Sequence, residues 1–221
     1  YGLMCNEHGM IFDDGVTSRL GENHYHMTTT TGGAARVMSW LEEFLQTEWL
    51  DMQVFCTSVT EQWSVLSISG PNARNFLSEL TDIDLSKESF PFMRFREGKV
   101  CGIDARVFRI SFTGELAFEI NIPARYGSYV WNEFMTHGKK YNITPYGTEA
   151  MHVLRAEKGF IIVGQDTDGS VTPFDLNMEW IVSKKKEDFL GKRSFSRSDT
   201  SRNDRKKLVG LLVNDKTTVL P

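Results

Sequence analysis

Cysteine is scarce in this sequence, and the cysteines it has are not arranged in pairs. The three, Cys5, Cys56 and Cys101, lie far apart and form no C-x-x-C motif. This usage argues against a disulfide framework and is typical of free, buried thiols in a reducing compartment. No neighbouring residue suggests an activating base, so a nucleophilic cysteine is not expected. We therefore expect a cytoplasmic protein.

Excess positive charge and long apolar runs are also missing. Twenty-five Lys and Arg residues against 29 Asp and Glu residues give a net charge of −4. Binding to nucleic acid in general needs a basic face, which this balance does not favour. No run of about 18 apolar residues is present, so no membrane span is expected. Neither a nucleic acid nor a membrane is an expected partner.

Nucleotide-binding and metal-binding fingerprints are absent as well. No G-x-G-x-x-G follows a predicted strand, and no G-x-x-x-x-G-K-[ST] occurs. The glycines in TTTTGGAAR (28–36) match neither spacing, which favours a tight turn into a helix over an anion site. The pair His24-x-His26 has no third ligand nearby, so no metal site is expected.

Apolar periodicity predicts a mixture of strands and helices. Strands are expected over 1–5, 10–12, 16–19, 25–31, 63–69, 99–112 and 116–122, and helices from 32–33 to 45 and over 71–80, 126–137 and 146–158, with a short helical element over 187–195. Gly159 is the expected C-cap of the last long helix. This order predicts an α+β fold of antiparallel sheets and helices in split βαβ-like subdomains.

Both ends of the sequence predict a fragment of a longer protein. The chain opens in a strand pattern, and the strand pattern over 207–213 is followed by only eight residues. The segment RSDTSRNDRKK (197–207) is polar and poor in apolar residues, as linkers are. We expect a domain over 1–196, a linker over 197–207 and the start of another domain over 208–221.

Two acidic residues, Asp13 and Asp14, directly follow the apolar run Met10–Phe12. An unpaired charge at the end of a buried strand costs several kcal/mol. Strand alternation points the two side chains in opposite directions, so at most one enters a given cavity. The residues alone leave two interpretations open, a turn at the surface and a carboxylate that meets a ligand.

A third acid, Glu119, lies within the apolar stretch LAFEINI (116–122). Alternation places it on the side of Ala117 and Asn121, opposite Phe118. Its carboxylate either faces solvent or meets a ligand with two adjacent N–H donors. Arg155 and Glu157 form another charged cluster, interpreted either as a structural ion pair or as part of a site.

Five segments resemble, in order, motifs of one family, the folate-dependent aminomethyltransferases or T-protein group of the glycine cleavage system. They are NEHGMIFDD (6–14), SISGPNAR (67–74), RISFTGELAFEI (109–120), LRAEKGFIIVGQD (154–166) and DFLGKRSF (188–195). The segments PYGTEAMHVLRAEKGFIIVGQDTDGSVTP and WIVSKKKEDFLGKRSF are most similar to one branch, the C-terminal part of the alpha subunits of heterotetrameric sarcosine oxidases.

Two departures set this chain apart from the glycine-cleavage enzymes. Where they have Gly-Ala-Arg-Asp, this chain has Glu149-Ala-Met151-His152, and it therefore lacks an arginine that they use near folate. Phe112 stands where they have a tyrosine, which removes a hydroxyl group but keeps the ring.

The resemblance implies a fold and residue roles. The fold is that of the aminomethyltransferase folate-binding domain, here without its first part, followed by the first strand of a truncated C-terminal β-barrel. Asp14 matches the catalytic aspartate and Glu119 the pterin-binding glutamate. Phe112, Thr30 and Thr31 match positions that line the cofactor cavity, and Arg155 is counted with them.

The resemblance also implies an activity. In the sarcosine oxidase branch, the imine from sarcosine oxidation is captured by tetrahydrofolate as 5,10-methylenetetrahydrofolate, and glycine is released. Flavin and NAD would lie only on missing regions or on partner subunits, with a flavin-bearing beta subunit expected. Open alternatives are a glycine-cleavage aminomethyltransferase, a dimethylglycine dehydrogenase-like or demethylase relative, a non-catalytic folate-binding module and a structural docking domain.

Overall fold

The computed structural model of the chain describes residues 1–215 and 217, which divide into two compact units. The first unit comprises Tyr1–Val54 and the described residues from Ile161 onward, and the second comprises Phe55–Phe160. Each unit is described by itself below. Within the described residues, no helix is long and apolar enough to cross a membrane.

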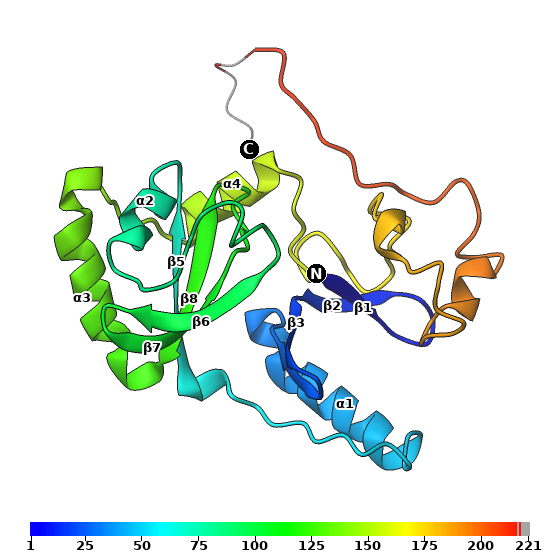
Figure 1. Ribbon diagram of the computed structural model, residues 1–221. Coiled ribbons are helices and arrows are strands. Elements are labelled where there is room, and N and C mark those ends of the chain that lie inside the picture. The colour runs from blue at the N-terminus through cyan, green and yellow to red at the C-terminus, as the bar shows by residue number, and fades with distance from the viewer. Residues whose placement is uncertain (216, 218–221) are drawn as a thin grey trace. The chain divides into compact units, whose positions relative to one another are not determined.

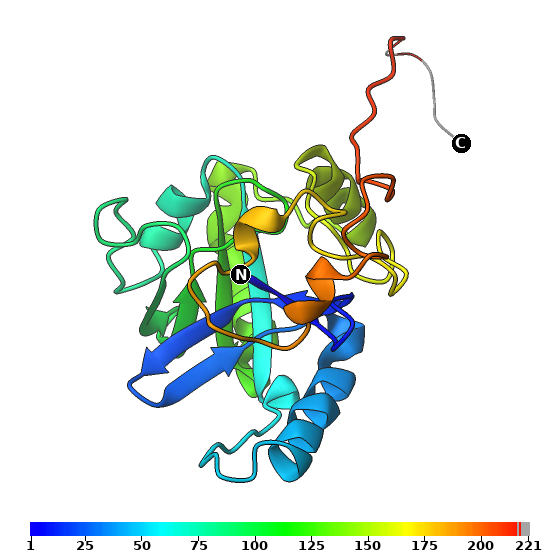
Figure 2. The ribbon, with the colours of Figure 1, turned by 90° about the vertical axis from the view of Figure 1, so that its right-hand side faces the viewer.

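The first unit begins with two small hairpins and a helix (Figures 1 and 2). Strand β1 (Gly2–Cys5) pairs antiparallel with β2 (Ile11–Gly15), and β3 (Thr17–Gly21) pairs with β4 (His24–Met27). The short turn η1 (Thr31–Gly33) leads into α1 (Ala34–Thr47). The strands expected in this part and the helix after the glycines are confirmed, although the expected strand over 25–31 ends early, at Met27.

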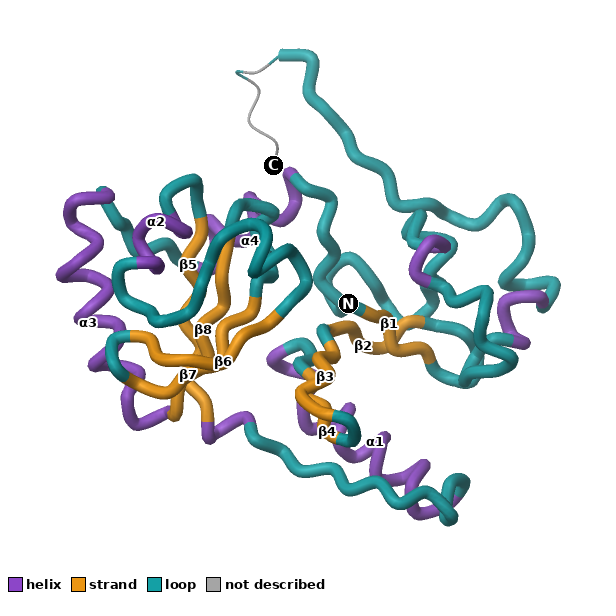
Figure 3. Tube along the Cα trace, viewed as in Figure 1, coloured by secondary structure: helices purple, strands orange, loops and turns teal. Residues whose placement is uncertain are grey.

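The rest of the first unit is mostly loop (Figure 3). Its short helical turns are η5 (Glu179–Ile181) and η6 (Arg193–Ser196), so the helical element expected over 187–195 forms only in its last part. The segment 197–207 contains no helix or strand, but it is held in place: Arg205 forms a salt bridge of 2.7 Å with the buried Asp175. The domain limits at 196 and 207 stay a prediction.

The expectation of a strand over 207–213 is wrong. Residues 208–213 are neither helix nor strand, and residues 216 and 218–221 lie outside the described part. Leu208 donates its N–H to the carbonyl of Asp175, and Asn177 donates to the carbonyl of Leu208. A strand needs a neighbouring strand for its main-chain groups, and beyond Leu208 no other part of the described chain supplies one.

The second unit is a four-stranded sheet with helices. In chain order its elements are η2 (Thr60–Gln62), β5 (Trp63–Ser69), α2 (Ala73–Ser78), β6 (Phe95–Val100), β7 (Ile103–Phe108), β8 (Ala117–Pro123), η3 (Ala124–Tyr126), α3 (Gly127–His137), η4 (Gly138–Tyr141) and α4 (Thr148–Glu157). The strand order is β5-β8-β7-β6, and every pair is antiparallel (Figure 1). One face packs on α2 and α3, through buried residues that include Phe76, Ile120 and Phe134.

Two details of this sheet differ from expectation. The single strand expected over 99–112 is split into β6 and β7 by a turn at Cys101 and Gly102, whose positive φ values of 51° and 78° suit a tight hairpin. In a split βαβ unit the strands on either side of the helix run parallel. Here β5 and β6, which flank α2 in the chain, lie at opposite edges of an alternating antiparallel sheet and so run antiparallel.

The end of α4 confirms the capping expectation. Gly159 has a φ of +73° and donates its N–H to the carbonyl of Ala156. Phe160 donates to the carbonyl of Arg155, which completes the two-bond pattern of a Schellman cap.

Candidate functional site

The two aspartates at the end of β2 occupy opposite environments, as alternation predicts. Asp13 is fully buried, whereas Asp14 is half-buried. The Asp13 carboxylate accepts hydrogen bonds from the N–H groups of Asp14 (2.9 Å) and Thr30 (3.0 Å) and from the Thr30 hydroxyl (3.0 Å). Arg36 of α1 adds a salt bridge of 3.3 Å. Asp13 is therefore a structural anchor, with its charge compensated by hydrogen bonds.

Gly33 makes room for this anchor. A Cβ atom on Gly33 would lie 1.8 Å from Oδ2 of Asp13 and 2.4 Å from the hydroxyl of Thr30. The first turn before α1 thus approaches the carboxylate so closely that only glycine fits. Thr30, expected to line a cofactor cavity, uses its hydroxyl to hold Asp13, and Thr31 is exposed at the start of η1.

Asp14 follows Asp13 in β2, and its main-chain N–H is held by the Asp13 carboxylate. Its Oδ2 accepts a hydrogen bond of 2.7 Å from the hydroxyl of Tyr1. Burial raises the pKa of Asp14, the Tyr1 hydrogen bond lowers it, and the charge of Asp13 raises it further, with a net increase. A carboxylate in a fixed position with a raised pKa is a stronger proton acceptor than an ordinary aspartate.

Glu119 is the half-buried carboxylate of the second unit. The sheet register places Ser67 of β5 on one side of it and Phe108 of β7 on the other, so all three share a face. Burial raises the pKa of Glu119. Its carboxylate accepts no hydrogen bond from the part of the chain that the structure describes, and Arg106 on the same face is paired with Glu97 (2.9 Å). Glu119 therefore has two free acceptor oxygens.

Phe112 and Arg155 complete the set of expected site residues. Phe112 is half-buried on the loop between β7 and β8, and Glu119 lies in β8, the strand that follows this loop. Arg155 is buried on α4, and its Nη1 donates to the carbonyl of Phe160 at 3.1 Å. Its guanidinium group thus supports the helix end, and its role toward a cofactor stays a prediction.

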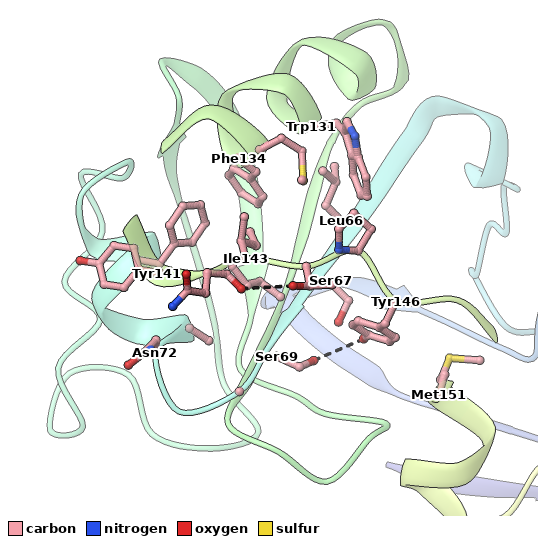
Figure 4. Close-up of a pocket in the computed structure, with 18 of the residues that line it drawn as sticks. Leu66, Ser67, Ser69, Asn72, Trp131, Phe134, Tyr141, Ile143, Tyr146 and Met151 are labelled. Carbon is pink, nitrogen blue, oxygen red and sulfur yellow. Dashed lines mark hydrogen bonds between the residues drawn. The ribbon is translucent and has the colours of Figure 1, made fainter. Parts of the chain in front are cut away.

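A pocket of about 580 Å³ lies beside β5 in the second unit (Figure 4). Its lining includes Ser67 and Ser69 of β5, Trp131 of α3 and the nearby Tyr146 and Met151. Ser69 and Tyr146 lie with their hydroxyl oxygens 3.4 Å apart. None of the lining residues is charged, so the pocket suits a neutral group and not an ion.

Sequence reasoning missed three residues that shape these sites. Tyr1, Arg36 and Ser67 contact or flank the predicted carboxylates. Asn121 was placed correctly on the strand face of Glu119 by alternation, and it is 5% exposed. The three missed residues are brought there by strand pairing or by helix α1, which local patterns do not predict.

Comparisons with known proteins give the same family as the five motifs. The family model described as the GCVT N-terminal domain matches residues 1–186. The chain is 60% identical to the sarcosine oxidase subunit alpha of Corynebacterium sp. (strain U-96) and 43% identical to that of Rhizobium meliloti (strain 1021), over 97% of this chain and 22% of each relative. It therefore spans about a fifth of the length of these curated relatives.

A solved structure agrees with the sequence comparisons. The glycine cleavage system aminomethyltransferase T from Bartonella henselae superposes with a TM-score of 0.72 at 25% identity, covering 87% of this chain and 50% of that one. The α+β fold with antiparallel sheets is thus confirmed as that of a T-protein. The chain belongs to the GCVT N-terminal domain family.

Proposed function

We propose that this chain takes part in tetrahydrofolate-dependent one-carbon transfer, as the folate-binding region of a sarcosine oxidase alpha subunit. The overall reaction would capture the imine from sarcosine oxidation as 5,10-methylenetetrahydrofolate and release glycine. The observation that carries this proposal is the contrast between the environments of Asp13 and Asp14 at the end of β2. A fully buried Asp13 is saturated with hydrogen bonds, and beside it Asp14 is left half-buried with a raised pKa.

Glu119 provides the test of whether a reduced pterin fits. A pterin ring presents a ring N–H beside an exocyclic amine, and a carboxylate can accept both hydrogen bonds at once. Glu119 is half-buried and accepts no hydrogen bond within the described chain, so both oxygens remain available. Desolvation of an unpaired carboxylate is unfavourable, and a ligand with two donors offsets it. The residues present fit the cofactor.

The chain's own residues would then have distinct roles. Bound tetrahydrofolate supplies the nitrogen nucleophiles that take up the one-carbon unit. Asp14 would accept the proton released at the nitrogen that forms the new bond, and its negative charge would stabilise the cationic imine. Asp13 fixes the direction of Asp14 through the main chain, because a misplacement of about 1 Å can cost about 100-fold in rate. Phe112 would pack on the pterin ring.

The remaining functions belong to parts of the protein outside this chain. The relatives are named as alpha subunits and are several times longer, so flavin, NAD and a flavin-bearing beta subunit are assigned to other regions or subunits. The imine would form there and reach Asp14 afterwards. We assign the assembly to the cytoplasm.

The test uses the complete enzyme with an Asp14→Asn substitution. With sarcosine and tetrahydrofolate supplied, we expect sarcosine oxidation to be unchanged and formation of methylenetetrahydrofolate to fall about 100-fold or more. Untransferred imine hydrolyses to formaldehyde, which should rise correspondingly. Asp51→Asn, at an exposed aspartate of the same unit, is the matched control. Unchanged methylenetetrahydrofolate yield in Asp14→Asn would show that Asp14 is not catalytic.

A glycine-cleavage aminomethyltransferase is the second candidate, favoured by the structural match to aminomethyltransferase T. Such an enzyme receives its aminomethyl group from a lipoyl carrier protein. Transfer that depends on the lipoyl carrier and proceeds without flavin subunits would favour this candidate. Folate binding without any transfer would instead favour a non-catalytic folate-binding module.

A further inference from the structure

Two arginines of the second unit are brought together without a carboxylate between them. Arg74 lies on α2 and Arg109 follows β7. Both guanidinium groups pack on the ring of Phe118, at 5.6 Å and 5.3 Å from its centroid. Arg109 also lies 5.6 Å from the centroid of Phe92, a ring that is 58% exposed. Both guanidinium groups therefore lie against the same buried ring, and that of Arg109 also lies beside an exposed one.

Most hydrogen-bond donors of this pair are unused. The guanidinium group of Arg74 donates to no described residue, and its Nη1 is buried. Arg109 donates from Nη1 to the carbonyl of Ala117 at 3.1 Å, while its buried Nε has no partner in the described chain. By contrast, Arg106 of the same sheet is paired with Glu97 at 2.9 Å. Positive charge and donors are thus left without an acceptor at one place in the unit.

The proximity of the two charges is itself unfavourable. Burial lowers the pKa of Arg109, and the positive charge of Arg74 lowers it further. Like charges that share a partly desolvated site destabilise each other, and an anion placed between them reverses the sign of the interaction.

We propose that Arg74 and Arg109 form a binding site for a phosphate group, either free phosphate or a small phosphate monoester. A phosphate dianion matches two positive charges, and its several oxygens can accept bonds from two guanidinium forks at once. The aromatic rings cover guanidinium faces and leave the in-plane N–H groups for the ligand. Both arginines are partly exposed, so an ion can reach them from solvent.

The phosphate site is distinct from the Glu119 site. Phe118 and Glu119 are neighbours on β8, so their side chains point to opposite faces of the sheet. Phe118 belongs to the core that packs on α2 and α3. The loop after Arg109 also contains Ser111 and Thr113, whose buried hydroxyl groups have no partner among the described residues. The ring that the two arginines contact and the Glu119 carboxylate therefore lie on opposite faces of β8.

The experiment is a calorimetric titration of the complete enzyme with inorganic phosphate in a phosphate-free buffer. Arg74→Gln and Arg109→Gln should each weaken phosphate binding by about 10- to 100-fold, as expected for loss of a charge-assisted pair. Arg125→Gln is the matched control, because Arg125 also stacks on an aromatic ring, that of Tyr126. The phosphate affinity of this variant should equal that of the wild type. Glycerol 1-phosphate serves as a second probe: tighter binding than phosphate assigns the site to a monoester, and weaker binding assigns it to the free ion.

Three results would overturn the proposal. They are the absence of phosphate binding to the wild type up to about 10 mM, equal affinity in Arg74→Gln and wild type, and acetate binding as tightly as phosphate. Because Arg109 also supports the Ala117 carbonyl, Arg109→Gln is interpreted only if its thermal unfolding matches the wild type. Arg74→Gln loses no hydrogen bond within the described chain and decides the question alone.

Discussion

The two units hold their key carboxylates in different ways. In the first unit Asp14 is fixed by its neighbour, because Asp13 is saturated with hydrogen bonds from Thr30 and the Asp14 main chain. In the second unit Glu119 is fixed by sheet register alone, between Ser67 and Phe108, and accepts no hydrogen bond from the described residues. The first arrangement is sensitive to packing around the anchor, and the second to the charge of the side chain itself.

The largest expected effect comes from filling the space beside the anchor. Gly33→Ala places a Cβ 1.8 Å from Oδ2 of Asp13 and should destabilise the first unit by about 3–5 kcal/mol. Gly32→Ala is the control, since its Cβ would meet nothing within 4 Å. Urea unfolding followed by circular dichroism measures both, and equal midpoints for the two variants would contradict the close approach.

Removal of the anchor should have the next largest effect. Asp13→Ala leaves the Thr30 N–H and hydroxyl without their acceptor and should cost about 2–3 kcal/mol in unfolding free energy. Asp14→Ala, which loses only the exposed bond to Tyr1, should change it by less than about 1 kcal/mol. A larger loss from Asp14→Ala than from Asp13→Ala would reverse the roles given to the two aspartates.

The second unit should respond through ligand affinity. If Glu119 holds a pterin, Glu119→Gln should weaken tetrahydrofolate binding by about 1–3 kcal/mol, because a charge-assisted pair is lost. Glu115→Gln, on the exposed part of the preceding loop, should leave the affinity unchanged. Titration calorimetry on the complete enzyme tests both, and equal affinities for Glu119→Gln and wild type would remove the pterin assignment.

The smallest effect is a dependence of stability on pH. A carboxyl whose pKa is raised by folding binds its proton more tightly in the folded state. Its contribution to the free energy of unfolding is therefore present at low pH and is lost as pH rises from the ordinary Glu range through the raised pKa. The Glu119→Gln variant should not show this loss of stability with rising pH. At pH 7 it should be slightly more stable than the wild type, by less than about 1 kcal/mol. Thermal unfolding between pH 4 and pH 7 measures the difference; parallel curves for the two proteins would show that Glu119 is not desolvated.

Local patterns were sufficient for most elements. The alternation of Trp63–Ser69 and the 3.6-residue period from Val37 to Leu45 predicted β5 and α1, because side-chain direction repeats with a fixed period along each. Gly159 was correctly predicted to end α4, because the positive φ at this position favours glycine. The turn at Cys101 and Gly102 was not predicted, because Gly102 was the sole local signal for it and the apolar alternation continues on both sides.

What the sequence by itself determined is the order of elements, the opposite orientation of Asp13 and Asp14, the apolar surroundings of Glu119 and the family motifs. Tertiary structure decided which aspartate is buried, since the donors that saturate Asp13 come from Thr30 and Arg36, far along the chain. It also decided that Arg74 and Arg109 share the ring of Phe118. Periodicity fixes the direction of a side chain within its own element, but its partners depend on how distant elements pack together.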